Sequence, residues 1–416
     1  MRLVLYTGKG GVGKTTTAAA SALQSAAQGK RTLLISADSS HSLSDVLAQK
    51  VGPKPIAIVD NLQAVEIDAR VEMGRHWGKI SEFLVALFRH QGIEGVVAEE
   101  LALLPGAEEL TTLLAVDEFA VSGEFDFAVV DCAPTDTTLR LLTLPDVAHS
   151  SLRLLLKIQR ALAGVMTPLA RSVVSVPLPS ADVFGEAEEL LYAKLGVLRA
   201  RIVDPQTSVR LVVTTERMVI EEARRAFTDL CLFGLRCDAV VVNRLLPEVA
   251  TREAFFREWG EVQQERLAEI TEIFAPLRVL EAKLGEEEII GPRSLLALGQ
   301  ELFSDCLPDD VLSNAQGIGF HSQGGRYSVS IPLPGATLDG VDITKVDGEL
   351  LVRTRSVSRA LKLPRRMAAL EVSEAHLREG VLSVYFRSGQ VQRDPNPGVD
   401  TSDPIGAGSG RAAAEG

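Results

Sequence analysis

The chain has 416 residues, of which 46% are hydrophobic, and a formal net charge of −12. This length predicts a large buried core and two domains, and the acidic charge balance argues against a nucleic-acid partner. No apolar run reaches the roughly 18 residues of a membrane span, and no signal peptide fits before a first predicted strand that begins at Arg2. The four cysteines show no pattern of disulfide pairs. We therefore expect a cytoplasmic protein without an integral membrane segment.

A glycine-rich loop follows the first predicted strand. Residues 3–6 are typical of a short buried strand, and the Ala-rich segment 18–27 is typical of a helix. The loop between them has the complete spacing G-x-x-x-x-G-K-T of a phosphate-binding loop. We predict that it binds ATP with Mg²⁺, with Lys14 on the β- and γ-phosphates and the Thr15 hydroxyl as a Mg²⁺ ligand. The predicted nucleotide-binding residues in the loop are Gly8, Gly10, Gly11, Val12, Gly13, Lys14, Thr15 and Thr16.

Lys9 is the second residue of this loop, where an ordinary phosphate-binding loop accepts almost any side chain. One reading is a solvated surface lysine. However, Gly-Lys-Gly-Gly-x-Gly-Lys-Thr resembles the deviant loop of ATPases that work as dimers, and that resemblance implies that Lys9 reaches the nucleotide of the partner chain. By analogy with an arginine finger, such a charge can accelerate phosphoryl transfer by about 10³–10⁵.

Apolar, β-branched segments alternate with helical patterns along the N-terminal part of the chain. The candidate strands are residues 32–36, 64–67, 127–131, 209–214 and 239–243. This alternation predicts an α/β fold, a doubly wound and mostly parallel sheet with helices on both faces. Ligand-binding groups should gather where the strands end at their carboxyl edge.

Three polar residues stand at these strand ends. Asp38 can orient an attacking water, although an Asp at this position can also be the N-cap of a helix. Asp131 can bond a Mg²⁺-bound water or the loop threonine. Asn243 offers a donor and an acceptor, which match the edge of adenine, but this signal is weak alone. We therefore predict Lys9, Lys14 and Asp38 as catalytic residues.

Two inserts, at about residues 70–120 and 150–200, have helical rather than strand patterns. The second is apolar around much of its helical circumference, as in helices that are buried or that bury something else. The inserts therefore form either a helical subdomain that packs on itself or an apolar groove for a partner helix.

The pattern changes near residue 310. We predict an ATPase domain over residues 1–310, a Gly/Ser-rich linker over 311–324, a small β-sandwich of alternating strands over 325–388, and a disordered tail over 389–416.

The N-terminal domain resembles the ATPases of arsenite transport and of tail-anchored membrane-protein targeting, in order from residue 1 to about 305. The resemblance implies a homodimer that closes on ATP, with Lys9 acting across the dimer, Asp38 positioning water, Asn243 on adenine, and hydrophobic transmembrane helices as clients of the helical inserts. No Cys-x-x-Cys follows Asn243, which puts a zinc-clamped dimer in doubt. The matching segments are 8–16, 35–45, 66–68, 105–109, 131–142 and 242–243.

The C-terminal domain resembles the α-crystallin domain of small heat-shock proteins over about residues 325–387. Only about ten residues separate Val352 from Leu363, so we predict that the long strand-swapping loop of many members is absent and expect no large oligomers. The matching segments are 327–335, 347–352, 363–364 and 375–382.

These features together predict a dimeric ATP-hydrolysing switch that binds hydrophobic helices of client proteins and targets or chaperones them, with a membrane receptor as a further partner. One alternative is a subunit of an anion-stimulated transport ATPase, with arsenite as the anion. A second is a holdase or scaffold that works without ATP, and a third is a septum-positioning or partition ATPase, which shares the deviant loop.

Overall fold

The computed structural model describes residues 1–38, 42–68, 71–72, 75, 82, 85–86, 89, 107–133, 135, 189, 194–313, 317–323 and 326–387. Most of the two predicted helical inserts and the whole tail over 389–416 lie outside these residues. Among the described helices, none is long and apolar enough to cross a membrane.

The N-terminal domain is built on an eight-stranded sheet with the order β3-β4-β2-β5-β1-β6-β7-β8. Every neighbouring pair is parallel except the edge pair β3 and β4. The predicted parallel α/β sheet is thus confirmed. The strands are β1 (Arg2–Thr7), β2 (Thr32–Ser36), β3 (Ile56–Val59), β4 (Leu62–Glu66), β5 (Phe127–Asp131), β6 (Thr207–Val213), β7 (Cys237–Leu245) and β8 (Arg278–Lys283).

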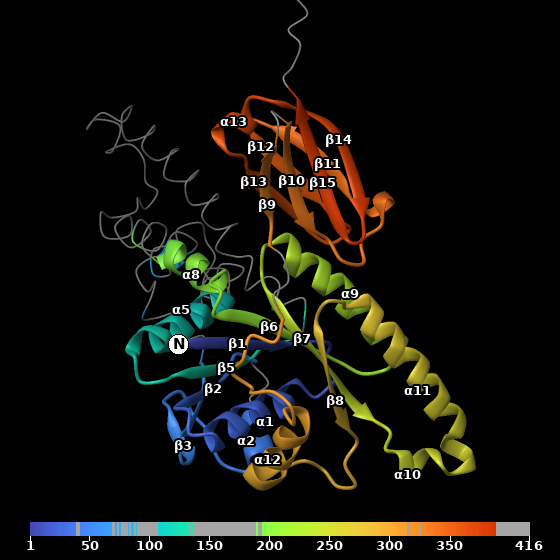
Figure 1. The fold of residues 1–416 in the computed structure, drawn as a ribbon. Helices are drawn as coiled ribbons and strands as arrows, with labels where there is room; N and C mark the ends of the chain where they lie inside the picture. The colour runs from blue at the N-terminus through green and yellow to red at the C-terminus, as the bar shows by residue number, and fades with distance from the viewer. Residues whose placement is uncertain are drawn as a thin grey trace, which may run out of the picture.

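Helices cover both faces of this sheet (Figure 1). One face carries α1 (Lys14–Ala27), α2 (Leu43–Leu47) and α12 (Gly291–Leu302). The other face carries α5 (Ala107–Ser122), α8 (Leu195–Ile202), α9 (Arg217–Leu232) and α11 (Ala254–Ile273). The short helix α10 (Glu248–Thr251) precedes α11. The strands β1, β2, β5 and β6 are buried along their whole length, as their continuous apolar runs predict for parallel strands covered on both faces.

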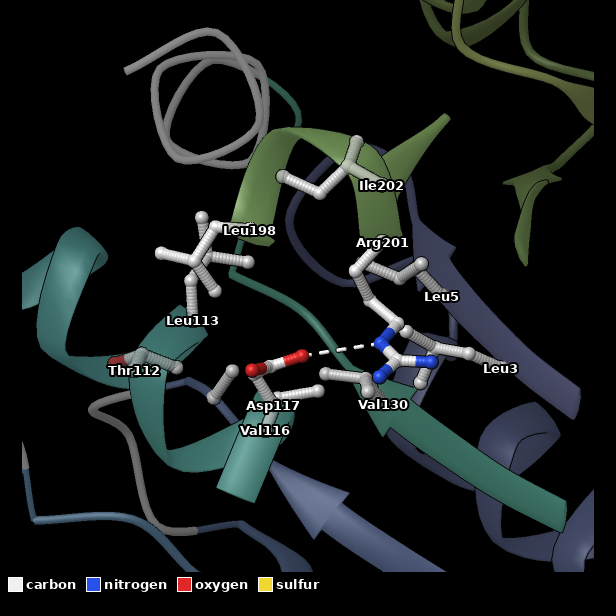
Figure 2. A pocket seen from close by; sticks show the side chains of 11 residues that line it. Leu3, Leu5, Thr112, Leu113, Val116, Asp117, Val130, Leu198, Arg201 and Ile202 are labelled. Carbon is white, nitrogen blue, oxygen red and sulfur yellow. Dashed lines mark hydrogen bonds and ion pairs between the residues drawn. The ribbon is translucent and has the colours of Figure 1, made fainter. Parts of the chain in front are cut away.

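The helices α5, at the end of the first predicted insert, and α8, at the end of the second, pack together on the sheet (Figure 2). Arg201 Nε donates to Asp117 Oδ1 at 3.0 Å and joins the two helices. Beside this ion pair is an enclosed cavity of about 20 Å³, lined mainly by apolar side chains such as Leu113, Leu198 and Ile202. A cavity of this size holds one water at most, so it is a packing defect and not a ligand site.

The C-terminal domain is a sandwich of two antiparallel sheets, as the alternating pattern predicts. A four-stranded sheet has the order β14-β15-β10-β9, and a three-stranded sheet has the order β11-β12-β13. The strand β9 lies inside the segment 311–324, which the sequence predicts to be a linker. The elements are β9 (Gly319–Gln323), β10 (Arg326–Pro332), η3 (Leu338–Gly340), β11 (Asp342–Val346), β12 (Glu349–Arg353), β13 (Ser358–Lys362), α13 (Arg365–Ala368), β14 (Glu371–Arg378) and β15 (Val381–Arg387).

The sandwich sits on the C-terminal half of α9 (Figure 1). Leu232 of α9 is fully buried in the apolar core of the sandwich and not in the core of the large sheet. Both carboxylate oxygens of Asp229 accept hydrogen bonds from the sandwich, at 3.0 Å from Thr354 Oγ1 and at 2.5 Å from Ser356 Oγ. The guanidinium of Arg359 bonds the Leu232 carbonyl and lies over the Phe233 ring at 5.6 Å. The two domains therefore share a packed and hydrogen-bonded contact.

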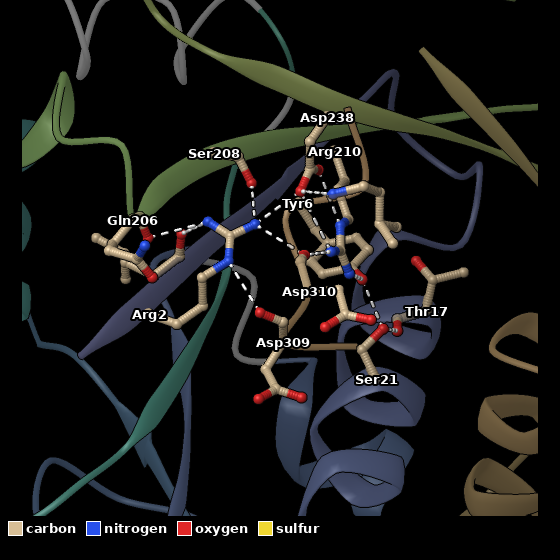
Figure 3. A network of polar contacts seen from close by, with 12 residues as sticks. Arg2, Tyr6, Thr17, Ser21, Gln206, Ser208, Arg210, Asp238, Asp309 and Asp310 are labelled. Atoms are coloured by element: carbon tan, nitrogen blue, oxygen red, sulfur yellow. Dashed lines mark hydrogen bonds and ion pairs between the residues drawn. The ribbon is translucent and has the colours of Figure 1, made fainter. Parts of the chain in front are cut away.

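A buried charged network lies on the side of the large sheet that α1 covers, where it reaches Ser21 of that helix (Figure 3). Asp238 accepts hydrogen bonds from Arg2 at 2.6 Å and from Arg210 at 3.0 Å, and both guanidinium groups also bond the carbonyl of Asp310. Burial alone would raise the pKa of Asp238, but the two arginines hold it below its ordinary value. The network ties strands β1, β6 and β7 to the segment that leads into the sandwich.

Candidate active site

The glycine-rich loop joins β1 directly to α1, as predicted. Gly13 is the N-cap of α1 with φ 94°, a left-handed conformation that favours glycine. A Cβ on Gly13 would lie 2.2 Å from Asn243 Nδ2, and one on Gly8 would lie 2.2 Å from the Val212 carbonyl oxygen. Both positions require glycine because the ends of β6 and β7 press against the loop.

Asn243 holds the loop from the end of β7. Its Nδ2 donates to the Val12 carbonyl at 2.8 Å, and its Oδ1 accepts from the Arg244 backbone N–H at 2.9 Å. Both polar atoms of this side chain therefore bond the protein backbone. The predicted contact with adenine stays a prediction, and the loop contact is a role that sequence reasoning missed.

Lys14 and Thr15 lie at the start of α1, where the loop N–H groups and the helix dipole favour anions. The Lys14 ammonium folds back and donates to the Lys9 carbonyl at 3.4 Å, which keeps its charge against the loop. Thr15 Oγ1 donates to Asp131 Oδ2 at 2.7 Å and lies 3.1 Å from Ser42 Oγ. Of the two roles predicted for Asp131, the bond to the loop threonine is present.

Asp131 is fully buried, and its Oδ1 has no hydrogen-bond partner among the residues that the structure describes. Burial raises its pKa to about 7, with a further contribution from the nearby Asp38, while the Thr15 hydrogen bond and the Lys14 charge act in the opposite direction. A buried carboxylate oxygen without a partner beside a threonine hydroxyl offers the hard oxygen donors that Mg²⁺ prefers. The residues therefore fit the cation, with Thr15 as the ligand and Asp131 acting through a bound water.

Asp38 lies two residues beyond the end of β2 and is half-buried. Its charge acts on Asp131, so the structure brings it to the same strand edge as the loop. Of two polar residues that follow Asp38 in the chain, His41 lies outside the described residues, whereas Asp45 is exposed in the first turn of α2.

Glu66 and Ser42 are two polar residues at this edge that sequence reasoning did not identify as site residues. Glu66 Oε1 accepts from the backbone N–H of Ser44 at 3.1 Å and fixes the start of α2. Ser42 contacts Thr15, as described above. The signal for Glu66 is its position at the end of β4, since parallel strands end at the same edge.

Lys9 points away from its own loop. Its ammonium pairs with Glu222 of α9 at 3.8 Å, and the two side chains are 37% and 29% exposed. The loop thus carries one lysine that is folded against the phosphate-binding backbone and a second lysine at the surface of the same edge.

Comparisons with known proteins decide the family. The sequence profile described as "Anion-transporting ATPase" matches residues 1–304, and the profile described as "HSP20-like domain found in ArsA" matches residues 324–386. The chain belongs to the anion-transporting ATPase family. It is thus an ATPase with a C-terminal HSP20-like domain, which confirms both resemblances stated from the sequence.

Two relatives cover nearly the whole length of this ATPase, and a third covers about three quarters of it. A protein named "Putative arsenical pump-driving ATPase 1" from Aquifex aeolicus is 33% identical over 396 residues, which cover 93% of this chain and 100% of that protein. A "Putative arsenical pump-driving ATPase" from Prosthecochloris vibrioformis is 34% identical over 400 residues, which cover 94% of this chain and 98% of that protein. "ATPase GET3" of Podospora anserina is 30% identical over 325 residues, 74% of this chain and 92% of its own.

The ATPase site can position its substrate largely with backbone and charge. We propose that glycine N–H groups and Lys14 would bind phosphate oxygens, and that Asp38 would accept a proton from the water that it orients. Mg²⁺, when bound at Thr15, would neutralise charge on the phosphates. Asp131 must be ionised to support that cation, so the proton that burial favours on this carboxyl would leave when nucleotide and metal bind.

Proposed function

We propose that this ATPase works as a homodimeric switch, in which ATP binding and hydrolysis control the binding of hydrophobic helical segments of client proteins. The observation that carries the dimer is the position of Lys9. The Lys14 ammonium is folded against the phosphate-binding loop of its own chain. The Lys9 ammonium instead lies at the surface, where it forms a partly exposed ion pair with Glu222. A partly exposed pair contributes little energy, so Lys9 can leave it for a phosphate on a second chain.

The client is proposed from three lines of support. The predicted inserts at 70–120 and 150–200 are rich in apolar residues at helical spacing. One relative carries the name "ATPase GET3". The HSP20-like domain resembles a chaperone domain, and its contact with α9 attaches it to the ATPase domain. Targeting to a membrane receptor would then follow client capture.

The client proposal is tested by mixing the purified protein with a hydrophobic helical peptide, with ATP or without nucleotide. Replacing Asp38 with Asn should slow hydrolysis and hold the ATP state, so this variant should retain the peptide longest on a sizing column. A protein that retains no peptide in either nucleotide state, with or without the substitution, would refute a client-binding role. If the Asp38→Asn protein releases peptide as the unchanged protein does, an ATP-independent holdase is favoured.

A second candidate is an anion-stimulated transport ATPase, which is favoured by the names of the relatives from Aquifex and Prosthecochloris. The cysteines argue against arsenite as the anion, because As(III) binds thiolates. Burial raises the pKa of the Cys231 thiol to about 12 and that of the Cys237 thiol well above its ordinary value, and Cys132 is also buried, so Cys306 is the one half-buried thiol. An increase in ATPase rate on addition of arsenite would favour this second candidate.

A further inference from the structure

A groove of about 630 Å³ lies on the four-stranded sheet of the HSP20-like domain. Side chains of the neighbouring strands β14, β15 and β10 line it (Figure 1). Leu382 and Val384 of β15 are buried in the core of the sandwich. Ser383 and Tyr385 alternate with them along the strand and line the groove, so they point to the opposite face. The groove therefore lies on the outer face of this sheet.

Three exposed arginines, Arg326, Arg378 and Arg387, line this groove. None of them forms a hydrogen bond or an ion pair with the part of the chain that the structure describes. Among the described residues that line the groove, Glu374 is the one acidic side chain. An arginine without a partner offers a planar set of N–H donors that matches a carboxylate or a phosphate. The groove is thus a positive surface on a chain whose net charge is −12.

The other sheet of the sandwich balances its charges across neighbouring strands. Asp342 of β11 stands opposite Arg353 of β12, and Glu349 of β12 stands opposite Lys362 of β13. Opposite charges that face each other in this way stabilise the sheet itself. Of the three groove arginines, one has an acidic residue, Glu371, opposite it in the strand register. The charge of the groove is therefore only partly balanced by its own sheet.

The arginines stand at the two ends of the groove. Arg378 of β14 is opposite Val381 at the start of β15, whereas Arg387 ends β15. Arg326 begins β10, and the register of β10 with β15 places it at the level of Arg387. Positions 381 and 387 are six residues apart, which is about 20 Å of strand at about 3.3 Å per residue. A single small anion cannot span this distance, so the two ends require a ligand that carries negative charge at both of its own ends.

The middle of the groove is polar but carries no unpaired positive charge. Ser383 and Tyr385 of β15 are flanked there by His376 and Glu374 of β14. His376 Nε2 lies 3.4 Å from Glu374 Oε2, and its ring meets the Tyr385 ring edge-on at 6.0 Å. Hydroxyl and imidazole groups can bond a peptide backbone, whereas the Glu374 carboxylate would repel a ligand with a negative charge on every unit, such as a nucleic acid.

We infer that this groove binds an extended acidic segment of a partner protein, with carboxylates at both ends of the segment and uncharged residues between them. The arginines would bind the carboxylates through charge-assisted hydrogen bonds, and the groups in the middle would bond the backbone. This site goes beyond the proposed function. The clients proposed above are apolar helices, whereas this partner is polar and is bound by the HSP20-like domain.

The test is fluorescence polarisation of a labelled peptide, Glu-Glu-Ser-Thr-Ser-Thr-Glu-Glu, mixed with the full chain. Its two glutamate pairs are about six residues apart, which matches the two ends of the groove. One control peptide has glutamine in place of every glutamate, and a second has glutamine in place of the last glutamate pair only. We expect the acidic peptide to bind at least about tenfold more tightly than either control, and its affinity to fall as salt is raised.

Charge-reversal variants locate the binding site. Arg378→Glu and Arg387→Glu should each raise the dissociation constant of the acidic peptide at least about tenfold. The matched control is Arg366→Glu in α13, which makes the same charge change at an exposed residue of the same domain outside the groove. It should change the constant less than about twofold. All three variants should keep the ATPase rate and the melting temperature, because the replaced side chains are exposed and none is in the active site.

Four outcomes would overturn the inference. The acidic peptide could bind no better than its glutamine counterpart, or Arg366→Glu could weaken it as much as Arg378→Glu does, which would show attraction to overall charge. A single-stranded RNA oligonucleotide that binds more tightly than the peptide and is lost with Arg378→Glu would assign the groove to nucleic acid. Complete displacement of the peptide by equimolar inorganic phosphate would assign it to a small anion. Each of these outcomes leaves the proposed ATPase switch standing.

Discussion

Asp131 shows how one buried carboxyl connects the fold to the chemistry. It is at the end of a buried strand, one oxygen bonds the loop threonine, and the other has no partner in the described part of the chain. Its raised pKa of about 7 means that this carboxyl is about half protonated at neutral pH in the nucleotide-free protein. The position of Asp131 was predictable from the strand and loop pattern, but its protonation state depends on burial that only the folded structure supplies.

A pH series should therefore reveal Asp131 in the nucleotide-free protein. Because its folded pKa is raised above the unfolded value near 4, the folded state binds more protons between these values, and stability falls as pH rises through about 7. The loss between pH 6 and pH 8 should be about 1.4 kcal/mol for this group, the equivalent of one pKa unit. Urea unfolding checks this against Asp131→Asn, which keeps an acceptor for Thr15 and should lack this component of the pH dependence.

Among the helices, α9 connects the active-site edge to the HSP20-like domain. Glu222 pairs with Lys9, and further along the same helix Asp229 and Leu232 contact the sandwich. The sequence predicts the two domains but does not predict that this helix joins them. The reason is that the pattern around Leu232 is the same whether its side chain packs on the large sheet or in the core of the sandwich. The edge strand β3 and the strand β9 also escaped prediction, since both are short and partly exposed.

Removing Asp229 should weaken the contact between the domains. Asp229→Ala removes the buried carboxylate that accepts hydrogen bonds from the half-buried Thr354 hydroxyl and the exposed Ser356 hydroxyl, at a cost of about 0.5–1.5 kcal/mol. Limited proteolysis should cut the segment between the domains faster in this variant. The matched control is Glu221→Ala on the same helix, which removes a surface ion pair with Arg224 and should leave the cleavage rate unchanged.

At the scale of the whole molecule, the network of Arg2, Arg210 and Asp238 attaches the last residues of the ATPase domain to its first strand. It joins the first strand to the carbonyls of Asp309 and Asp310, just before the chain passes to the HSP20-like domain. Arg210 bonds the Tyr6 hydroxyl, which bonds Ser21 of α1, so the network also reaches the helix that starts at the phosphate-binding loop. Spacing along the chain gives no signal for a contact between residues 2 and 310.

Breaking this network should destabilise the protein strongly. Asp238→Ala leaves two buried guanidinium groups without their carboxylate and should cost about 3–5 kcal/mol of unfolding free energy. Chemical denaturation measures this. Asp126→Ala, which removes the exposed partner of Arg31, serves as the control and should have a much smaller effect. An equal effect of the two substitutions would contradict a special role for the buried network.

The central claim is that each active site is made by two chains, with Lys9 supplied by the partner. The most direct test mixes two variants that should each be nearly inactive, Lys9→Ala and Asp38→Asn. In a mixed dimer, the Lys9→Ala chain keeps its own Asp38 and receives Lys9 from the partner subunit. The account predicts that mixing restores about one quarter of the unmodified rate, because half of randomly formed dimers are mixed and each has one intact site. A mixture that stays as inactive as its two components, although sedimentation shows that mixed dimers form, would contradict it.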